Sequence, residues 1–147
     1  MTSSDFIQQQ MEENFYLANQ AERMRLIVAT SNLLLATALQ VCIGVLDLER
    51  RILFLTVWMI LLGVYGIFTS MKLYERENYH RSRVRKLRGK LNNLYLDVDL
   101  EKLFKEIEQE HKQVYPRLMA LRLNNIWVAF HALIALLGII YTIFSLL

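Results

Sequence analysis

The sequence predicts an all-α integral membrane protein in which three transmembrane helices continue into a cytosolic helical stalk. Three windows contain no Asp, Glu, Lys or Arg: residues 26–46, 52–70 and 126–147. Each is close to the roughly 20 residues that a helix needs to cross a bilayer. The composition agrees, because 54% of the residues are hydrophobic and the mean hydropathy is positive.

The first apolar window is expected to remain in the protein as a transmembrane helix. The residues before it are rich in Gln, Glu and Asn. A secretory signal peptide begins instead with a short basic segment and ends at a small-residue cleavage site. Cys42 lies inside this window and is the only cysteine, so the sequence offers no disulfide within the chain.

The positive charges determine the expected orientation. Arg50 and Arg51 lie between the first two windows, whereas the other 15 of the 17 Lys and Arg residues precede the first window or lie between the second and the third. The positive-inside rule places those 15 residues on the cytoplasmic side. We therefore expect a plasma-membrane protein with its N-terminus in the cytoplasm and its C-terminus outside.

Nearly all of the remaining chain is predicted to be helical, because it has one Pro, five Gly and no linker-like tract. The segment "TSSD" (residues 2–5) is expected to cap the first helix, and Pro116 to interrupt the helix that leads to the third span. We expect four parts: a cytosolic N-terminal helix (1–25), a transmembrane hairpin (26–70), a cytosolic basic and acidic helical hairpin (71–124) and a third transmembrane helix (125–147).

A basic face is predicted on the helix that follows the second span. Glu77, His80 and Val84 share one helical face at spacings of three and four, and the positive residues fall on the other faces. We expect these residues to fix the topology and to meet anionic lipid head groups. The near absence of interleaved stacking aromatics does not favour nucleic-acid binding. The basic face consists of Arg81, Arg83, Arg85, Lys86, Arg88 and Lys90.

The cytosolic hairpin contains two Glu-x-x-His units, "ENYH" at residues 77–80 and "EQEH" at residues 108–111. Helical spacing places Glu77, His80, Glu108 and His111 on or beside the buried face, so we expect a polar cluster across the hairpin. Di-iron and di-manganese bundles take the same unit from two of their helices. A metal bound by these four residues is the minor alternative, because the di-iron pattern needs a fourth helix with its own Glu, which one copy of the chain lacks. No cofactor is expected.

Small and polar residues recur every seven positions within the predicted spans. They are Thr30, Thr37 and Gly44 in the first span, Thr56, Gly63 and Ser70 in the second, and Asn124, His131, Gly138 and Ser145 in or beside the third. One interpretation is close helix packing within a bundle. The other is a polar path through an oligomer, which Asn32, Gln40 and His131 favour, because uncharged polar groups at membrane depth usually face a partner or water.

The sequence contains no Gly-rich phosphate loop, no G-x-S-x-G motif and no cysteine cluster, so we expect no enzymatic activity. A transmembrane hairpin followed by "KLYERENYHRSRVRKLRGKLNNL" (72–94) resembles the SLATT-type membrane effectors of bacterial anti-phage and nucleotide-signalling operons, over residues 15–94. The resemblance implies a homo-oligomer in the bacterial inner membrane that permeabilises it when a cytosolic protein or nucleotide activates it. Two function classes remain open: a pore-forming or membrane-disrupting effector, and a membrane anchor or scaffold for a cytosolic complex.

Overall fold

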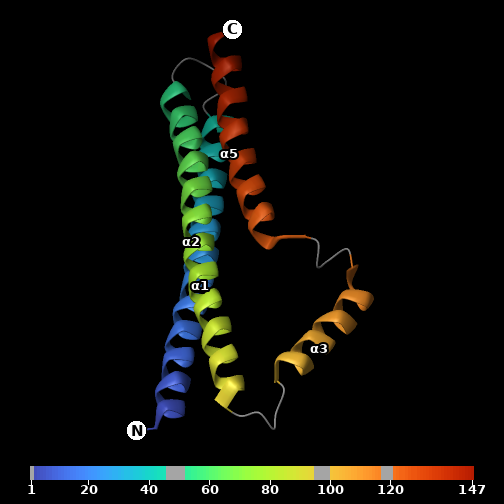
Figure 1. Ribbon diagram of the computed structural model, residues 1–147. Coiled ribbons are helices and arrows are strands. Elements are labelled where there is room, and N and C mark those ends of the chain that lie inside the picture. The colour runs from blue at the N-terminus through green and yellow to red at the C-terminus, as the bar shows by residue number, and fades with distance from the viewer. Residues whose placement is uncertain (1, 46–51, 95–99, 117–120) are drawn as a thin grey trace. The chain divides into compact units, whose positions relative to one another are not determined.

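The computed structural model describes residues 2–45, 52–94, 100–116 and 121–147, and these residues form helices and no strand. The all-α expectation is therefore confirmed for the part of the chain that is described. The helices α1, α2 and α5 each contain a segment long and apolar enough to cross a membrane. The helices are α1 (Ser3–Val45), α2 (Leu53–Leu94), α3 (Leu100–Val114) and α5 (Leu123–Leu146) (Figure 1).

The chain forms two compact units, and α1 and α2 run through both of them. The first unit comprises residues 1–22 and 75–122, which include α3. The second unit comprises residues 23–74 and 123–147, which include α5. The three windows without charged residues all belong to the second unit. Most of the charged residues of the sequence therefore belong to the first unit.

The first helix begins with a capping box at residues 2–5. The backbone N–H of Asp5 donates to Thr2 Oγ1 over 3.2 Å, and the backbone N–H of Thr2 donates to Asp5 Oδ2 over 2.8 Å. Each side chain thus satisfies a backbone donor that the first turn leaves without a helical partner. The cap expected from "TSSD" is confirmed.

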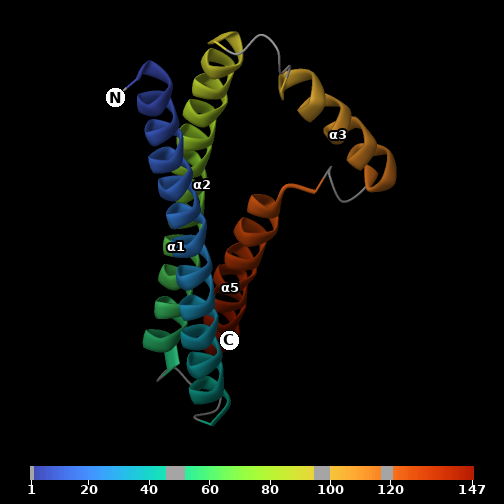
Figure 2. The ribbon, with the colours of Figure 1, turned by 90° about the horizontal axis from the view of Figure 1, so that it is seen from below.

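A regular seam joins α1 to α2, which lie side by side (Figure 2). Buried positions on both helices recur mostly at spacings of three and four residues, as they do along the interface of two helices packed lengthwise. Many of them are Ala or Gly, which allow the backbones to approach closely. The buried positions are Asn14, Ala18, Ala21, Arg25, Ala29, Asn32, Ala36 and Ile43 of α1, Ile52 just before α2, and Thr56, Met59, Gly63, Gly66, Ser70, Glu77, His80 and Val84 of α2.

Helix α5 packs against α2 at two glycines. A Cβ added to Gly63 would lie 2.5 Å from the backbone nitrogen of Ala135, and one added to Gly138 would lie 2.9 Å from the backbone nitrogen of Ile60. Both distances are far shorter than real Cβ contacts, so the two backbones touch directly. Because Gly63 faces Ala135 while Gly138 faces Ile60, the two helices run antiparallel.

The buried stripe of the first span differs from the predicted one. Thr30 and Thr37 are exposed, whereas Ala29 and Ala36, one position earlier, are buried. The Thr30 hydroxyl donates to the Leu26 carbonyl over 2.9 Å and the Thr37 hydroxyl to the Leu33 carbonyl over 2.8 Å. A hydroxyl satisfied by its own helix needs no partner on a neighbouring helix, so within one copy of the chain these two residues do not mark the helix contact.

We expect Gly63→Ala to lower the stability of the folded protein, because the methyl group would overlap the backbone of α5. Forcing an extra carbon into a close-packed interface costs about 1–3 kcal/mol. The free energy of unfolding in mixed detergent micelles, measured by denaturant titration, tests this expectation.

Gly44 provides the matched control, because it lies in α1 with nothing within 4 Å of its added Cβ. Gly44→Ala should leave stability unchanged or raise it by up to about 1 kcal/mol, since Ala has the higher helix propensity. Equal effects at Gly44 and Gly63 would contradict the direct backbone contact of α2 and α5.

Candidate functional site

The candidate site in the second unit is centred on His131 of α5. Its side chain is 0% exposed, and neither ring nitrogen has a hydrogen-bond partner among the described residues. A Cβ added to Gly66 would overlap the imidazole ring and would lie 2.7 Å from Asn32 Nδ2. The missing side chain of Gly66 therefore creates the space in which the imidazole lies, with the Asn32 amide beside it.

Asn32 is the closest polar neighbour of this space, and its own hydrogen bond is weak. It is 3% exposed, and its Nδ2 donates to the Leu62 carbonyl at 3.5 Å, the outer limit for such a bond. The sequence analysis took Asn32 and His131 as favouring a polar path through an oligomer, and in the structure both are buried. Both residues face the interior of one copy of the chain.

Further buried polar atoms lie in the same unit. Ser70 is 1% exposed, and its Oγ has no partner among the described residues, as is also true of Asn124 Oδ1. A buried polar group without a hydrogen bond costs about 1–3 kcal/mol. Ser70 Oγ and Asn124 Oδ1 can therefore gain free energy from water or a solute that offers hydrogen bonds. Arg25 is also buried, and its guanidinium group lies 5.7 Å from the centre of the Tyr74 ring.

A second polar group in this unit is internally satisfied. Thr142 Oγ1 lies 2.8 Å from Thr56 Oγ1, and Gln40 Nε2 donates to the Tyr141 hydroxyl over 3.3 Å. The small residues Ala36, Gly63 and Ala135 are buried, and in residue number each lies between this group and the His131 site on its own helix. The helices thus have a polar seam in two parts, and within the described ranges the part around His131 contains ring nitrogens without hydrogen-bond partners.

In the first unit, His80 of α2 is paired with Asn14 of α1. His80 Nδ1 lies 3.1 Å from Asn14 Oδ1, while Asn14 Nδ2 donates to the Gln10 carbonyl over 2.7 Å. Because the amide nitrogen of Asn14 is already used, its oxygen accepts from a protonated Nδ1. Burial lowers the pKa of His80 below the usual histidine range, with further lowering by Arg76 and Arg83 and an opposing effect of Glu13.

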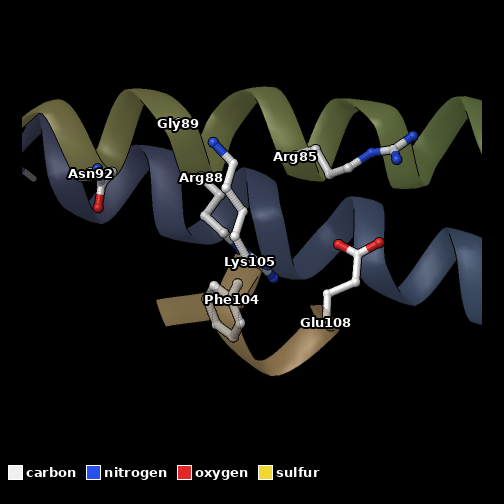
Figure 3. Close-up of a pocket in the computed structure, with 7 residues that line it drawn as sticks. All are labelled: Arg85, Arg88, Gly89, Asn92, Phe104, Lys105 and Glu108. Atoms are coloured by element: carbon white, nitrogen blue, oxygen red, sulfur yellow. The ribbon is translucent and has the colours of Figure 1, made fainter. Parts of the chain in front are cut away.

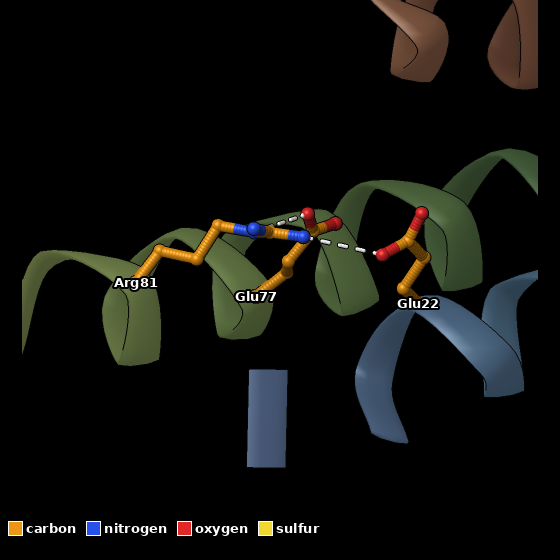
Figure 4. A network of polar contacts seen from close by, with 3 residues as sticks. All are labelled: Glu22, Glu77 and Arg81. Carbon is orange, nitrogen blue, oxygen red and sulfur yellow. Dashed lines mark hydrogen bonds and ion pairs between the residues drawn. The ribbon is translucent and has the colours of Figure 1, made fainter. Parts of the chain in front are cut away.

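Glu77 belongs to an ion-pair network that also joins α1 to α2 (Figure 4). Arg81 Nε donates to Glu77 Oε1 over 2.8 Å, and Arg81 Nη2 donates to Glu22 Oε2 over 3.2 Å. Glu77 is 8% exposed, so its charge needs a partner close by. Arg81 of the basic face therefore contributes to the contact between α1 and α2, although its side chain remains 42% exposed.

The structure does not bring the two Glu-x-x-His units together, which corrects the predicted cluster. Glu77 and His80 are buried against α1, whereas Glu108 and His111 of α3 are exposed. The His111 ring packs 5.0 Å from the Tyr115 ring on its own helix. The physical reason is that α1 already covers the face of α2 that carries Glu77 and His80. Among the described residues, no group of three or more His, Cys, Asp or Glu could hold a metal ion.

The other residues of the basic face lie at the surface. Arg83, Arg85, Lys86 and Lys90 are exposed. The Arg88 guanidinium group lies 4.6 Å from the centre of the Phe104 ring of α3, which is a cation–π contact. Arg85 and Arg88 line a cavity of about 320 Å³ together with Gly89 and Asn92 of α2 and Phe104, Lys105 and Glu108 of α3 (Figure 3).

Two buried polar residues, Asn14 and Arg25, were missed by the sequence interpretation. A usable signal was present, because Asn14 and Ala21 are seven residues apart, as are Arg25 and Asn32. All four lie on the buried stripe of α1. The periodicity was missed because the predicted stripe was defined by small and hydroxylated residues, and the charged Arg25 is neither.

The fold and its buried polar seam define a helical-bundle protein with three helices that could span a membrane. No protein-family model, curated protein sequence or solved structure matches this chain. The SLATT-type resemblance therefore rests on the sequence motifs alone.

We expect acidification to destabilise the first unit through His80. Because the folded pKa of His80 is lowered, the unfolded chain binds a proton more readily, and stability falls as the pH drops below about 6.5 towards the folded pKa. Thermal unfolding followed by circular dichroism at a series of pH values between neutral and acidic measures this effect.

The matched variants are His80→Gln and His111→Gln, because His111 is exposed on α3. His80→Gln should weaken the pH dependence, whereas His111→Gln should retain it. An unchanged pH dependence in His80→Gln would show that other groups cause it.

Proposed function

We propose that this protein is an integral protein of the bacterial inner membrane that assembles with copies of itself and opens a path across the membrane. Its helices α1, α2 and α5 are long and apolar enough to serve as the spans. The distribution of positive charge favours a cytoplasmic N-terminus and an outside C-terminus. In this arrangement the first unit is the cytosolic part that controls opening, and the SLATT-type resemblance suggests a role in phage defence.

The observation that carries the proposal is the burial of His131 without a hydrogen-bond partner. Its 0% exposure leaves both ring nitrogens unsatisfied among the described residues, within helices whose other faces are apolar. Lipid cannot satisfy these atoms, whereas water entering between α5 and the α1–α2 pair can. Ser70 Oγ, also buried without a partner, adds to this tendency. A bundle that served only as an anchor would gain stability from apolar residues at both positions.

Assembly is supported by aromatic residues of the first unit. Phe6, Tyr16 and Tyr79 are each at least 55% exposed. Lipid does not reach a cytosolic segment, so another protein surface must cover such residues if they are to leave water. Further copies of this chain are the proposed cover, with a cytosolic activator protein or nucleotide as the signal. Exposed Arg83, Lys86 and Lys90 offer contacts to anionic head groups or to an acidic activator.

The alternative function is a membrane anchor or scaffold for a cytosolic complex. It is favoured by the apolar residues on α3, where Leu103, Ile107 and Val114 are all exposed. A docking helix for a partner protein would present such a row. The two functions differ in one measurable property, which is the passage of ions.

We expect liposomes of phosphatidylethanolamine and phosphatidylglycerol that contain the purified protein to pass protons or potassium ions. His131→Leu should reduce the flux several-fold, because it removes the polar group that attracts water into the seam. The flux is measured by a fluorescent pH or potassium indicator inside the vesicles. The amounts of unsubstituted protein and of His131→Leu in the vesicles are first shown to be equal after the vesicles are dissolved in detergent.

Thr37→Val is the matched control, because Thr37 is a polar residue of α1 that faces outward. It should leave the flux unchanged if the path runs along the interior seam. A loss in Thr37→Val without a loss in His131→Leu would place the path between copies. No flux at any pH, in the presence of cell extract or nucleotides, would favour the scaffold.

A further inference from the structure

One face of α2 carries an open groove in the first unit. The groove has a volume of about 260 Å³ and lies between α1 and α2. Val84, 8% exposed, lies deepest in it, and Phe15 of α1 is 53% exposed beside it. Its lining is Phe15, Asn78, Arg81, Val84, Arg85 and Arg88, and we call it the arginine groove.

Helix α3 already contacts this face of α2 at the far end of the arginine groove. Arg85 and Arg88 line both the arginine groove and the cavity that contains Phe104 and Glu108 of α3. Figure 3 shows Phe104, Lys105 and Glu108 extending from α3 beside Arg85 and Arg88 of α2. The groove and the cavity are therefore consecutive sections of one surface.

The residue numbering places the rest of α3 in register with the groove. Phe104 lies at Arg88, with 4.6 Å between the guanidinium carbon and the ring centre, and Glu108 shares a cavity with Arg85. Ascending numbers on α3 thus meet descending numbers on α2, as in an antiparallel pair. Continued at the common helical rise of about 1.5 Å per residue, this register brings Val114 to the level of Asn78.

The chemistry of the two surfaces also matches. Ile107 and Val114 of α3 are 50% and 65% exposed, and the arginine groove presents Phe15 and Val84 to them. Glu106, Glu108 and Glu110 flank this apolar row on α3, while Arg81, Arg85 and Arg88 flank the groove. The apolar row of α3 is bordered by acidic residues, and the apolar part of the groove is bordered by arginines. This complementary charge favours one specific docked arrangement of the two surfaces.

We propose that α3 is a strap that closes lengthwise into the arginine groove of its own chain, and that its release allows α5 to move. Helix α3 is joined through the chain to α5, and α5 carries His131 and Gly138. The strap is therefore covalently linked to the polar seam. This regulatory role rests on the proposed function, whereas the closure itself does not. The chain's own α3 is favoured over that of a second copy because it is tethered and already held at Arg88, which gives a high effective concentration.

The closure is tested by a disulfide between Asn78→Cys and Val114→Cys, in a chain whose exposed Cys42 is replaced by Ser. With full-length protein in liposomes and a mild oxidant, we expect a disulfide within one chain, seen on a non-reducing gel at monomer mass. Lys112→Cys replaces Val114→Cys in the matched control, because residue 112 lies about 200° around the helix from residue 114. A disulfide requires Cα atoms within about 7 Å, so the control pair should react about tenfold more slowly.

Equal rates for the two pairs would overturn the closure, and a dimer-mass product from mixed single-cysteine proteins would assign the groove to a second copy. Glu108→Arg should slow formation of the Asn78→Cys/Val114→Cys disulfide about twofold to fivefold, the effect of losing a surface ion pair. Adding Arg85→Glu to the same chain should restore the rate. Failure of the restoration would contradict the predicted register.

The regulatory role is tested with the same disulfide-bonded protein. Ion flux should be low while the disulfide is intact and should rise after reduction, because only then can α3 leave the groove. Flux that is independent of a fully formed disulfide would overturn control by α3. A disulfide that forms in a protein without any flux would leave the closure standing and remove the proposed function.

Discussion

The close packing of α1 against α2 is the constraint on which the rest of the structure depends. Their buried positions recur mostly every three or four residues over most of the length of both helices, and the small residues among them allow direct approach of the backbones. Both units are built on this pair. Helix α5 packs on the glycines of α2, and the arginine groove is lined by Phe15 of α1 and Val84 of α2. A change in the register of the seam would therefore alter every site described.

The seam treats its polar residues differently in the two units. In the first unit they are paired, with His80 on Asn14 and with Glu77 and Glu22 on Arg81. Such pairs fix the register, because slippage would leave buried charges without partners. In the second unit His131 and Ser70 have no partner among the described residues.

The sequence predicts the elements of the fold better than their contacts. Windows without charge identify the apolar helices, and "TSSD" identifies the cap, because both signals are local. The partner of a face is not a local property. The row of Glu77, His80 and Val84 indicates a buried face of α2, but it does not show that α1 and not α3 covers it. The one-residue offset between the predicted and the buried stripe of the first span has a similar origin, because Thr30 satisfies its hydroxyl within its own helix while Ala29, which has no polar side chain, is buried.

Spin-label accessibility along α1 tests most directly which residues form the seam in the second unit. Single cysteines at residues 28–37, in a chain with Cys42 replaced by Ser, would be labelled in liposomes and exposed to oxygen, which partitions into lipid. We expect accessibility minima at Ala29, Asn32 and Ala36 and high values at Thr30 and Thr37. Minima at Thr30 and Thr37, or a profile without a helical period, would contradict it.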